Sequence, residues 1–381
     1  MTNKENATNQ PVSRLVVKVG SSTLTTDTGK PDESYLQDMA EQVNVLRQEG
    51  TEVLIVSSAA IVAGLNSLNM PTTRPDDIST LQAAAAVGQI ELAQSYAQAF
   101  ARQDIQLAQV LMTRNDTINR EAYLHVRDTL ERLLELGIVP LINENDTIAI
   151  DEIRFGDNDT LAAQVAILVK ADLVVLLSDI EGLYTADPRL SEDAELLERV
   201  GEFTHEIVEA AGSAGSEKGS GGMFTKIEAA RMLMAASIPM VICKGRKEDA
   251  ILHATRGTMT GTRFEREQQG KQVGARRLWL SLSGTVCGEV FVDNGAVKAL
   301  RERGSSLLPV GVVSFKGDFE EGSVVDIRDE GGLLIGRGIS NYSSADMDMV
   351  AGHRTEALDN LQVIENKSKY EVVHRDAMVI F

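Results

Sequence analysis

The sequence has few of the residues on which disulfide scaffolds, metal sites and nucleic-acid-binding surfaces are built. Only two of its 381 residues are cysteines, Cys243 and Cys287, and neither has metal-ligand spacing to any of the five histidines. Two cysteines exclude a disulfide framework, so we expect a reducing cytoplasm as the compartment. Basic residues are also outnumbered, with 37 Lys and Arg against 56 Asp and Glu. The resulting formal charge of −19 repels nucleic-acid phosphates and anionic membrane surfaces.

Long apolar runs and two common nucleotide-binding motifs are absent as well. The longest apolar stretch, residues 161–177, is interrupted by Gln164, Lys170 and Asp172. This indicates a buried helix followed by a buried strand rather than a membrane span. No G-x-x-x-x-G-K-[ST] or G-x-G-x-x-G string occurs. Residues 1–12 are polar, so we expect a disordered lead-in and no signal peptide.

What the sequence does contain is a regular alternation of short β-branched runs and longer segments with helical periodicity. The short runs lie at residues 14–19, 52–56, 105–111, 138–142, 172–177 and 239–243. The helical segments lie at residues 35–48, 78–102, 119–136, 159–170 and 225–236. This alternation predicts an α/β domain with an open, mostly parallel sheet sandwiched by helices.

The pattern changes in the last third of the chain. Short strands separated by Gly and Asn appear there, as in GTVCGEVFVDNGAV and GSVVDIRDEGGLLIGRGIS, and they predict a small, mostly-β domain. The polar segment EREQQGKQVG has the composition of a linker. We therefore place the first domain at residues 13–264, the linker at 265–274 and the second domain at 275–381.

Two of the predicted strands end in short loops that suit a ligand. KVGSS begins at Lys18 and offers one cation and backbone N–H groups beyond the carboxyl end of a strand, where ligands bind in open α/β sheets. The alternative is a surface lysine ahead of a turn. SSAAIVAG, residues 57–64, combines small residues with a helix start, although taken alone it is better explained by helix capping through Ser57 or Ser58.

Two dense polar clusters follow the strand predicted at 138–142. They are NENDT, residues 143–147, and GDNDT, residues 156–160. A turn needs only one or two such residues, whereas paired clusters can hold an ammonium group, orient lysines or bind a cation. We interpret them as functional.

Two further loops have the composition of a nucleotide site. GSGGMFTK, residues 219–226, places glycine N–H groups and a lysine at the start of a predicted helix, as a phosphate cradle requires. LLSDIEGLYTADPR, residues 176–189, leaves a buried strand through Ser178 and Asp179, and nucleotide contact and plain turn chemistry explain this segment equally well. None of these loops contains a histidine or a cysteine, so no nucleophile–base pair can be assigned. Phosphoryl transfer to an already ionised carboxylate fits this composition, because it needs only positioning and cations.

Taken together and in this order, the motifs resemble the amino acid kinase family, in particular its glutamate-phosphorylating members with a C-terminal PUA domain. The strings that carry the resemblance are LVVKVGSS, PLINENDT, FGDNDTLAA, LLSDIEGLYTADPR, GSGGMFTK, ERGSSLLPVGV and VVHRDAM. The resemblance implies the amino acid kinase fold and ATP-dependent phosphorylation of the glutamate γ-carboxylate to γ-glutamyl phosphate, the first step of proline biosynthesis. It assigns neutralisation of the phosphates to Lys18 and Lys226, and the orientation of both lysines to Asp157.

The resemblance also implies where the two substrates bind. Ser58, Asp146 and Asn158 match the family's glutamate contacts. The positions that match its nucleotide site are Lys18, Ser178, Asp179, Ser220, Gly221, Gly222, Met223, Phe224, Thr225 and Lys226. Mg²⁺ is expected to bridge the ATP phosphates, and because it usually keeps several waters no dedicated protein metal site is expected.

Three positions depart from the family pattern. Ala59 stands where the family usually has Gly, Ser178 where Thr is common, and Phe224 where Ser or Thr is common. If the backbone at residue 59 approaches the bound glutamate, the extra methyl of Ala59 is expected to weaken substrate binding.

The partners implied by the resemblance are L-glutamate, ATP and proline as a feedback inhibitor at or near the glutamate site. PUA modules bind RNA in modification enzymes, but residues 275–381 contain twelve Lys and Arg against sixteen Asp and Glu. RNA binding stays open, and an interaction or assembly role fits this charge at least as well. The apolar strands predicted at 310–315 and 372–381 favour a homo-oligomer, and no membrane partner is expected.

Two other functions remain as alternatives. The first is another carboxylate or carbamate kinase of the same fold. The second is an RNA-binding or sensor protein with a decayed kinase domain, against which the intact Lys18, Asp157 and Lys226 argue.

Overall fold

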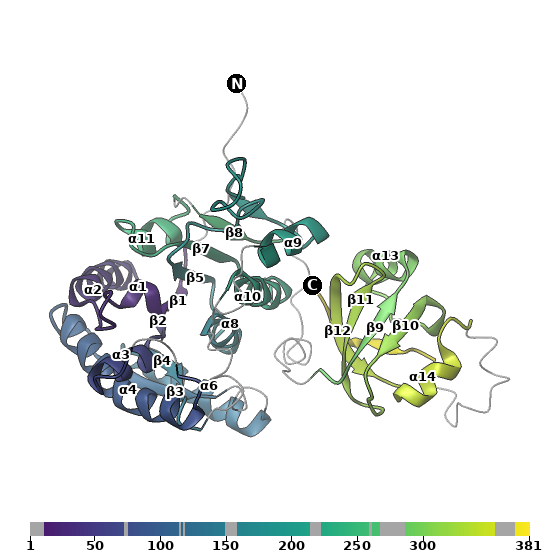
Figure 1. Ribbon diagram of the computed structural model, residues 1–381, viewed down its shortest axis with the longest axis horizontal. Helices are drawn as coiled ribbons and strands as arrows, with labels where there is room; N and C mark the ends of the chain where they lie inside the picture. The colour runs from purple at the N-terminus through teal and green to yellow at the C-terminus, as the bar shows by residue number, and fades with distance from the viewer. Residues whose placement is uncertain are drawn as a thin grey trace. The chain divides into compact units, whose positions relative to one another are not determined.

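The largest feature of the fold is a mostly parallel sheet (Figure 1), seen in a computed structural model that describes residues 11–71, 75–113, 116, 119–148, 158–213, 222–258, 261–266, 286–354 and 370–381. Its strands are β1 (Arg14–Val19), β2 (Glu52–Ser57), β3 (Leu107–Met112), β4 (Val139–Glu144), β5 (Leu173–Ser178), β6 (Arg199–Val200), β7 (Met240–Lys244) and β8 (Thr262–Phe264). They lie side by side in the order β3-β4-β2-β1-β5-β7-β8-β6. The strand β1 is therefore central.

The direction of the strands confirms the predicted fold class, with one addition. Every neighbouring pair from β3 to β7 is parallel, and so is the pair β6–β8. The pair β7–β8 is antiparallel. The strands β6 and β8 were not predicted from the sequence, because runs of two and three residues are too short to show a period.

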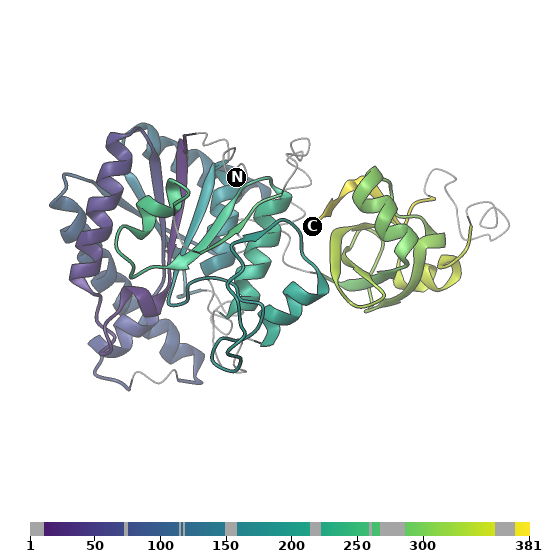
Figure 2. The same cartoon turned by 90° about the horizontal axis from the view of Figure 1, so that it is seen from above.

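Helices cover both faces of this sheet, as Figure 2 shows. One face packs against α2 (Glu33–Gln48), α4 (Ile78–Ala101) and α11 (Ala250–Thr255) in a continuous apolar core. The other helices of this part of the chain are α1 (Ser21–Leu24), α3 (Ala60–Ser67), α6 (Arg120–Glu135), α8 (Asn158–Leu168), α9 (His205–Ser213) and α10 (Met223–Ala235). In the described residues no helix has the length and apolarity needed to cross a bilayer.

The alternation of side chains along β1 decides where its lysine points. Val17 and Val19 belong to the core shared with α2, α4 and α11. Successive side chains of a strand point to opposite faces, so Lys18 lies on the other face of the sheet. There α8 contacts β1, β2, β4 and β5. Every residue of α8 except Thr160 is buried, and its only charged residue is Asp159.

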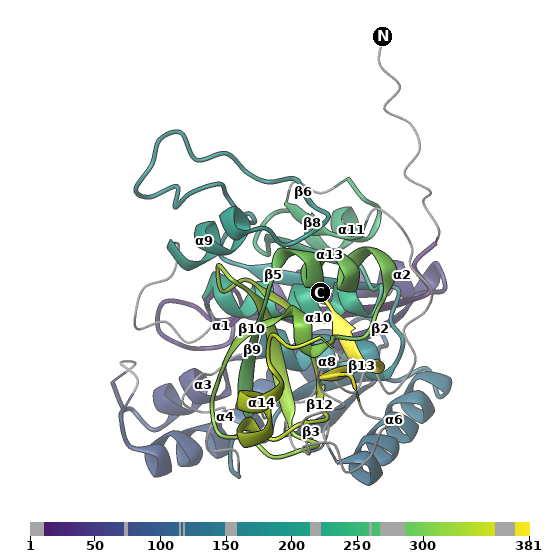
Figure 3. The ribbon, with the colours of Figure 1, turned by 90° about the vertical axis from the view of Figure 1, so that its right-hand side faces the viewer.

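The chain divides into two compact units. The first unit ends at Glu267, and the main part of the second unit begins at Gln268. Two short segments, Glu202–Val208 and Met234–Ser237, group with the second unit. In the described residues, the second unit contains a sheet of order β10-β9-β11-β12-β13 together with the helices α13 and α14. The strand β11 is labelled in Figure 1, and the other strands and both helices are labelled in Figure 3. These elements are β9 (Gly288–Val292), α13 (Asn294–Arg303), β10 (Val312–Lys316), β11 (Val324–Asp329), β12 (Leu334–Ser340), α14 (Ser344–Val350) and β13 (Val373–Ile380).

The second unit has an apolar core of its own. Val290 and Ile327 from the sheet pack in one cluster with Leu300 of α13 and Met347 of α14. The pair β9–β11 is parallel, and the pairs β9–β10, β11–β12 and β12–β13 are antiparallel. The mostly-β character predicted for this part of the chain is confirmed.

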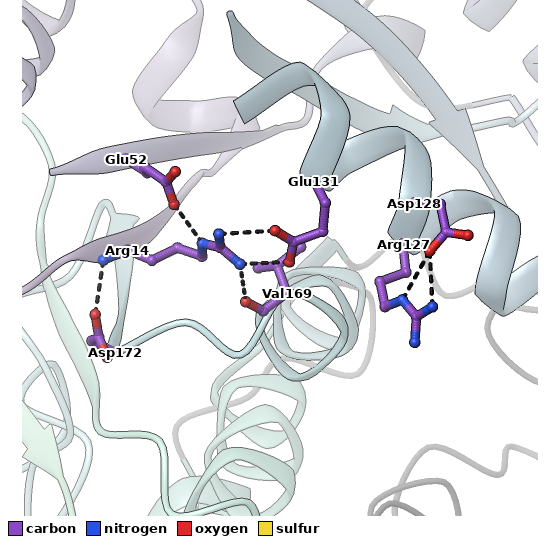
Figure 4. A network of polar contacts seen from close by, with 7 residues as sticks. All are labelled: Arg14, Glu52, Arg127, Asp128, Glu131, Val169 and Asp172. Carbon is purple, nitrogen blue, oxygen red and sulfur yellow. Dashed lines mark hydrogen bonds and ion pairs between the residues drawn. The ribbon is translucent and has the colours of Figure 1, made fainter. Parts of the chain in front are cut away.

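An arginine at the start of β1 fixes the amino-terminal edge of the larger sheet (Figure 4). The guanidinium of Arg14 donates to Glu52 Oε2 at 2.8 Å and to both carboxylate oxygens of Glu131 at 2.6 and 3.0 Å. It also donates to the carbonyl of Val169, just beyond the end of α8. Burial alone lowers the pKa of Arg14, but the hydrogen bonds to Glu131 and Glu52 outweigh it and raise that pKa. Arg14 therefore joins β1, β2, α6 and the end of α8.

Replacing Arg14 tests the strength of this junction. Arg14→Met keeps the apolar stem and leaves two carboxylates and a carbonyl without their donor, so we expect the free energy of unfolding to fall by about 2 kcal/mol. Arg127→Met is the matched control, because it removes the exposed Arg127–Asp128 pair from the same helix as Glu131. Urea denaturation should show a lower midpoint for Arg14→Met only. An equal loss in both variants would contradict this role.

Candidate functional site

Two buried lysines share one buried aspartate at the carboxyl ends of the central strands. Lys18 Nζ lies 2.5 Å from Asp159 Oδ1, and Lys226 Nζ lies 2.9 Å from Asp159 Oδ2. Lys18 comes from β1, Asp159 from the first turn of α8 and Lys226 from the first turn of α10. The carboxylate is fully buried and both lysine side chains are only 7% exposed. Among these three groups two cations share one anion, an arrangement suited to binding a further anion.

The charge of Asp159 is fixed by the two lysines. Burial alone raises the pKa of Asp159, but the neighbouring charges of Lys18 and Lys226 and their hydrogen bonds outweigh it and lower that pKa below its ordinary value. A depressed pKa means that this stabilisation is complete above the ordinary aspartate pKa and is lost as the pH falls toward the depressed value. Asp159 therefore remains ionised at neutral pH.

A threonine lies between this bridge and the residue that precedes α10. Thr225 Oγ1 lies 2.8 Å from the carbonyl oxygen of Gly222 and 3.4 Å from Asp159 Oδ2. Its single proton serves the closer carbonyl and so holds Gly222 against the first turn of α10. Met223 is buried and Phe224 is 61% exposed.

An asparagine next to Asp159 joins the ends of β2 and β4. Asn158 Nδ2 donates to the carbonyl of Ser57 at 2.5 Å and to Asn143 Oδ1 at 2.7 Å, and Ser58 Oγ lies 3.3 Å away. The Nδ2 group of Asn143 is buried and has no partner within the described part of the chain. An unsatisfied buried donor is costly, so an acceptor atom of a ligand at this point would be favoured.

The segment after β2 is held in place by close packing of α3 on α4. A Cβ atom at Gly64 would lie 1.7 Å from the carbonyl oxygen of Ala84, and one at Gly88 would lie 1.8 Å from that of Ala60. The two helices therefore touch through their backbones, which fixes the start of α3. Ala59, immediately before α3, has φ 79° and ψ 4°, a left-handed conformation that favours glycine.

On the other side of β1 lies the end of β5. Ser178 is buried and donates to Asp179 Oδ1 at 3.1 Å. The carbonyl of Ser178 accepts from the N–H of Gly245, just after β7, at 2.8 Å. The ends of β1, β2, β4, β5 and β7 therefore form one continuous polar edge.

Comparison with known proteins connects this edge to a family. The model of the amino acid kinase family matches residues 13–244, and that of the PUA domain matches residues 288–361. The chain belongs to the amino acid kinase family.

Curated relatives cover nearly the whole chain. A protein of Geobacter sp. (strain M21) named "Glutamate 5-kinase" is 40% identical over 97% of this chain and 98% of its own length. Proteins of the same name from Thermoanaerobacter sp. (strain X514) and Ralstonia pickettii (strain 12J) are 41% and 44% identical, each over 96% of this chain and 97% of theirs. The similarity includes the PUA region.

The structure brings several of the residues predicted from the sequence together. Lys18 and Lys226 meet at one carboxylate, and Ser58 lies beside Asn158. Asp146 lies in the turn after β4 and is half-buried. Ser178 ends β5 and Asp179 directly follows it, while Gly222, Met223, Phe224 and Thr225 lead into Lys226. Asp157, Ser220 and Gly221 lie outside the described residues.

Asp159 contacts both lysines but is not among the site residues predicted from the sequence. The predicted partner of the lysines is Asp157, two positions earlier in GDNDT. One signal pointed to Asp159: a charged residue that opens an otherwise apolar helix must be paired if the helix is buried. The described residues contain no group of three His, Cys, Asp or Glu side chains arranged to bind a metal.

The conformation of Ala59 gives a test of backbone strain at the site. Ala59→Gly relieves a left-handed alanine, worth about 1 kcal/mol, and loses a similar amount to the greater freedom of glycine in the unfolded chain. We expect little change or a small gain in stability. Ala63→Gly, in the interior of α3, has no such relief and should lose about 1 kcal/mol. Thermal unfolding compares the two, and equal losses would show that residue 59 is unstrained.

Proposed function

We propose that this protein transfers the γ-phosphoryl group of ATP to the side-chain carboxylate of L-glutamate. The product is γ-glutamyl phosphate, and the reaction is the first step of proline biosynthesis. The observation that carries the proposal is the buried Lys18–Asp159–Lys226 bridge at the strand ends. Full-length relatives named "Glutamate 5-kinase" support glutamate as the acceptor.

The arrangement of charges suits this chemistry without a general base. A glutamate carboxylate is already ionised at neutral pH, so one of its oxygens can attack the γ-phosphorus directly. A bond from that oxygen to phosphorus forms while the bond to the bridging β–γ oxygen breaks, and ADP leaves with the electron pair. Lys18 and Lys226 would neutralise the oxygens of the transferring group. Asp159 holds the two ammonium groups in place and carries no proton in the reaction.

The two substrates would approach the bridge from opposite sides of β1. We assign the amino acid to the β2 and β4 side, where Ser58, Asn158 and Asp146 lie, and where the carboxylate of Asp146 is suited to an ammonium group. We assign the nucleotide to the β5 and β7 side, at Ser178, Asp179 and the loop ending in Lys226. Each oxygen of Asp159 pairs with a lysine, so this carboxylate does not fit as a Mg²⁺ ligand. Mg²⁺ bound through the ATP phosphates would supply further charge neutralisation.

Four further properties complete the proposal, of which proline inhibition rests on the family resemblance and the other three on the composition of the chain. Proline would compete at or near the glutamate site as a feedback inhibitor. The protein would act in the cytoplasm as a homo-oligomer. The acidic PUA region would serve interaction or assembly rather than RNA binding.

A trapping assay tests the proposed reaction. With ATP, Mg²⁺ and hydroxylamine, an acyl phosphate is converted to a hydroxamate, and we expect the product with L-glutamate and not with L-aspartate or N-acetylglutamate. Lys226→Met is the control that assigns the activity to this site, and it should lower kcat by about 100-fold or more. Hydroxamate from aspartate or N-acetylglutamate in place of glutamate would support the alternative of a different carboxylate kinase. No product from any acceptor would contradict the proposal.

A further inference from the structure

A connection without a predicted role lies against the nucleotide side of the site. It is the segment 245–249, between β7 and α11. A Cβ atom on Gly245 would lie 2.7 Å from Thr23 Cγ2 and 2.9 Å from Leu177 Cβ. The backbone at Gly245 therefore packs directly on the end of β5 and on α1, with no space for a side chain at this position.

The next residue, Arg246, reaches from this connection to the turn that follows Lys18. Its Nη1 donates to Asp32 Oδ2 at 2.8 Å and its Nη2 donates to the carbonyl of Thr25 at 3.2 Å. The guanidinium carbon also lies 5.5 Å from the ring centre of Tyr35. The other oxygen of Asp32 accepts from the N–H of Tyr35 and caps α2. Arg246 thus holds both the end of α1 and the start of α2.

Three hydrogen bonds hold the turn at residues 20–25 against the end of β5 and the segment 245–249, and together we call them the frame. At its start, the N–H of Gly20 donates to the carbonyl of Leu177 at 3.1 Å, and at its end Arg246 holds Thr25. The N–H of Gly245 donates to the carbonyl of Ser178. Because Lys18 lies two residues before the turn and Asp179 directly follows Ser178, the frame fixes one relative to the other.

We infer that Arg246 is a positioning residue for the nucleotide, holding the turn after Lys18 in register with Ser178 and Asp179. This rests on the proposed function, which assigns the nucleotide to that side of β1. The contacts of Asn158 with Ser57, Ser58 and Asn143 lie on the opposite side. Loss of Arg246 should therefore weaken nucleotide use and leave amino acid binding unchanged.

The chain contains a closely matched control for this arginine. Arg256 Nη2 pairs with Glu49 Oε1 at 2.7 Å and also joins the end of α11 to α2. The two arginines are similarly exposed, 44% for Arg246 and 48% for Arg256. Glu49 lies at the opposite end of α2 from Asp32. The Arg256 pair therefore shares the helix of the Arg246 pair and has an arginine of similar exposure, but its carboxylate is more exposed, 51% for Glu49 against 15% for Asp32, and it lies away from the site.

The experiment compares Arg246→Ala, Arg246→Lys, Asp32→Asn and Arg256→Ala in the full chain. We expect Arg246→Ala to lower kcat/KM for ATP by about tenfold while the KM for glutamate changes less than about twofold. Arg246→Lys should recover part of the loss, because lysine keeps the charge but not the two-pronged geometry. Asp32→Asn should show the same selective loss, since asparagine still caps α2. Arg256→Ala should match the wild type in both constants.

Binding of a non-hydrolysable ATP analogue, measured by calorimetry, separates this inference from the proposed function. If the wild type binds the analogue but phosphorylates no glutamate, the proposed function fails while the dissociation constants of the variants still decide the role of Arg246. If Arg246→Ala does not fold, Arg246→Lys and Asp32→Asn give the decision. The inference is overturned if these variants match Arg256→Ala, or if their KM for glutamate rises as much as that for ATP.

Discussion

The site depends on one carboxylate that pairs with two lysines inside the protein. Without Asp159, the ammonium groups of Lys18 and Lys226 would face each other in a buried region, where like charges repel strongly. With it, each lysine is held by its own carboxylate oxygen. The strand β1 contributes Lys18, the helix α8 contributes Asp159 and the helix α10 contributes Lys226. The three charges can therefore pair only when these elements are packed together, and this packing in turn brings the charges into a buried region where they have to pair.

The rest of the larger unit supports this arrangement at both ends of β1. At the amino-terminal edge, Arg14 joins β1 to the end of α8, the helix whose first turn carries Asp159. At the carboxyl edge, Asn158 joins α8 to β2 and β4. Both ends of α8 are therefore fixed against the sheet. A helix held in this way can place a carboxylate with the accuracy that phosphoryl transfer needs.

Much of the fold was predictable because its strands and helices have clear periods. The runs at 14–19 and 172–177 became β1 and β5 with bounds that differ by one residue at most. The lysines were also predictable, since each belongs to a short motif at a strand end or helix start. The partner of the lysines was not, because α8 is apolar on all sides and its pattern does not show which face meets the sheet.

Contacts between distant segments explain the other omissions. Arg246 and Asp32 are separated by 214 positions, and no local pattern marks either residue as a partner of the other. The left-handed conformation of Ala59 was equally hidden, although the glycine usual at this position in the family pointed to an unusual backbone there. Such features follow from how the elements pack, which a single sequence does not state.

The central claim is that Lys18, Asp159 and Lys226 act as one unit. The most direct test is the turnover number at saturating substrates for Asp159→Asn, Lys226→Met and the double variant. The account predicts that Asp159→Asn alone lowers kcat by about 100-fold or more and that the double variant is little slower than the slower single variant. Turnover near that of the wild type for Asp159→Asn, or losses that multiply in the double variant, would contradict it.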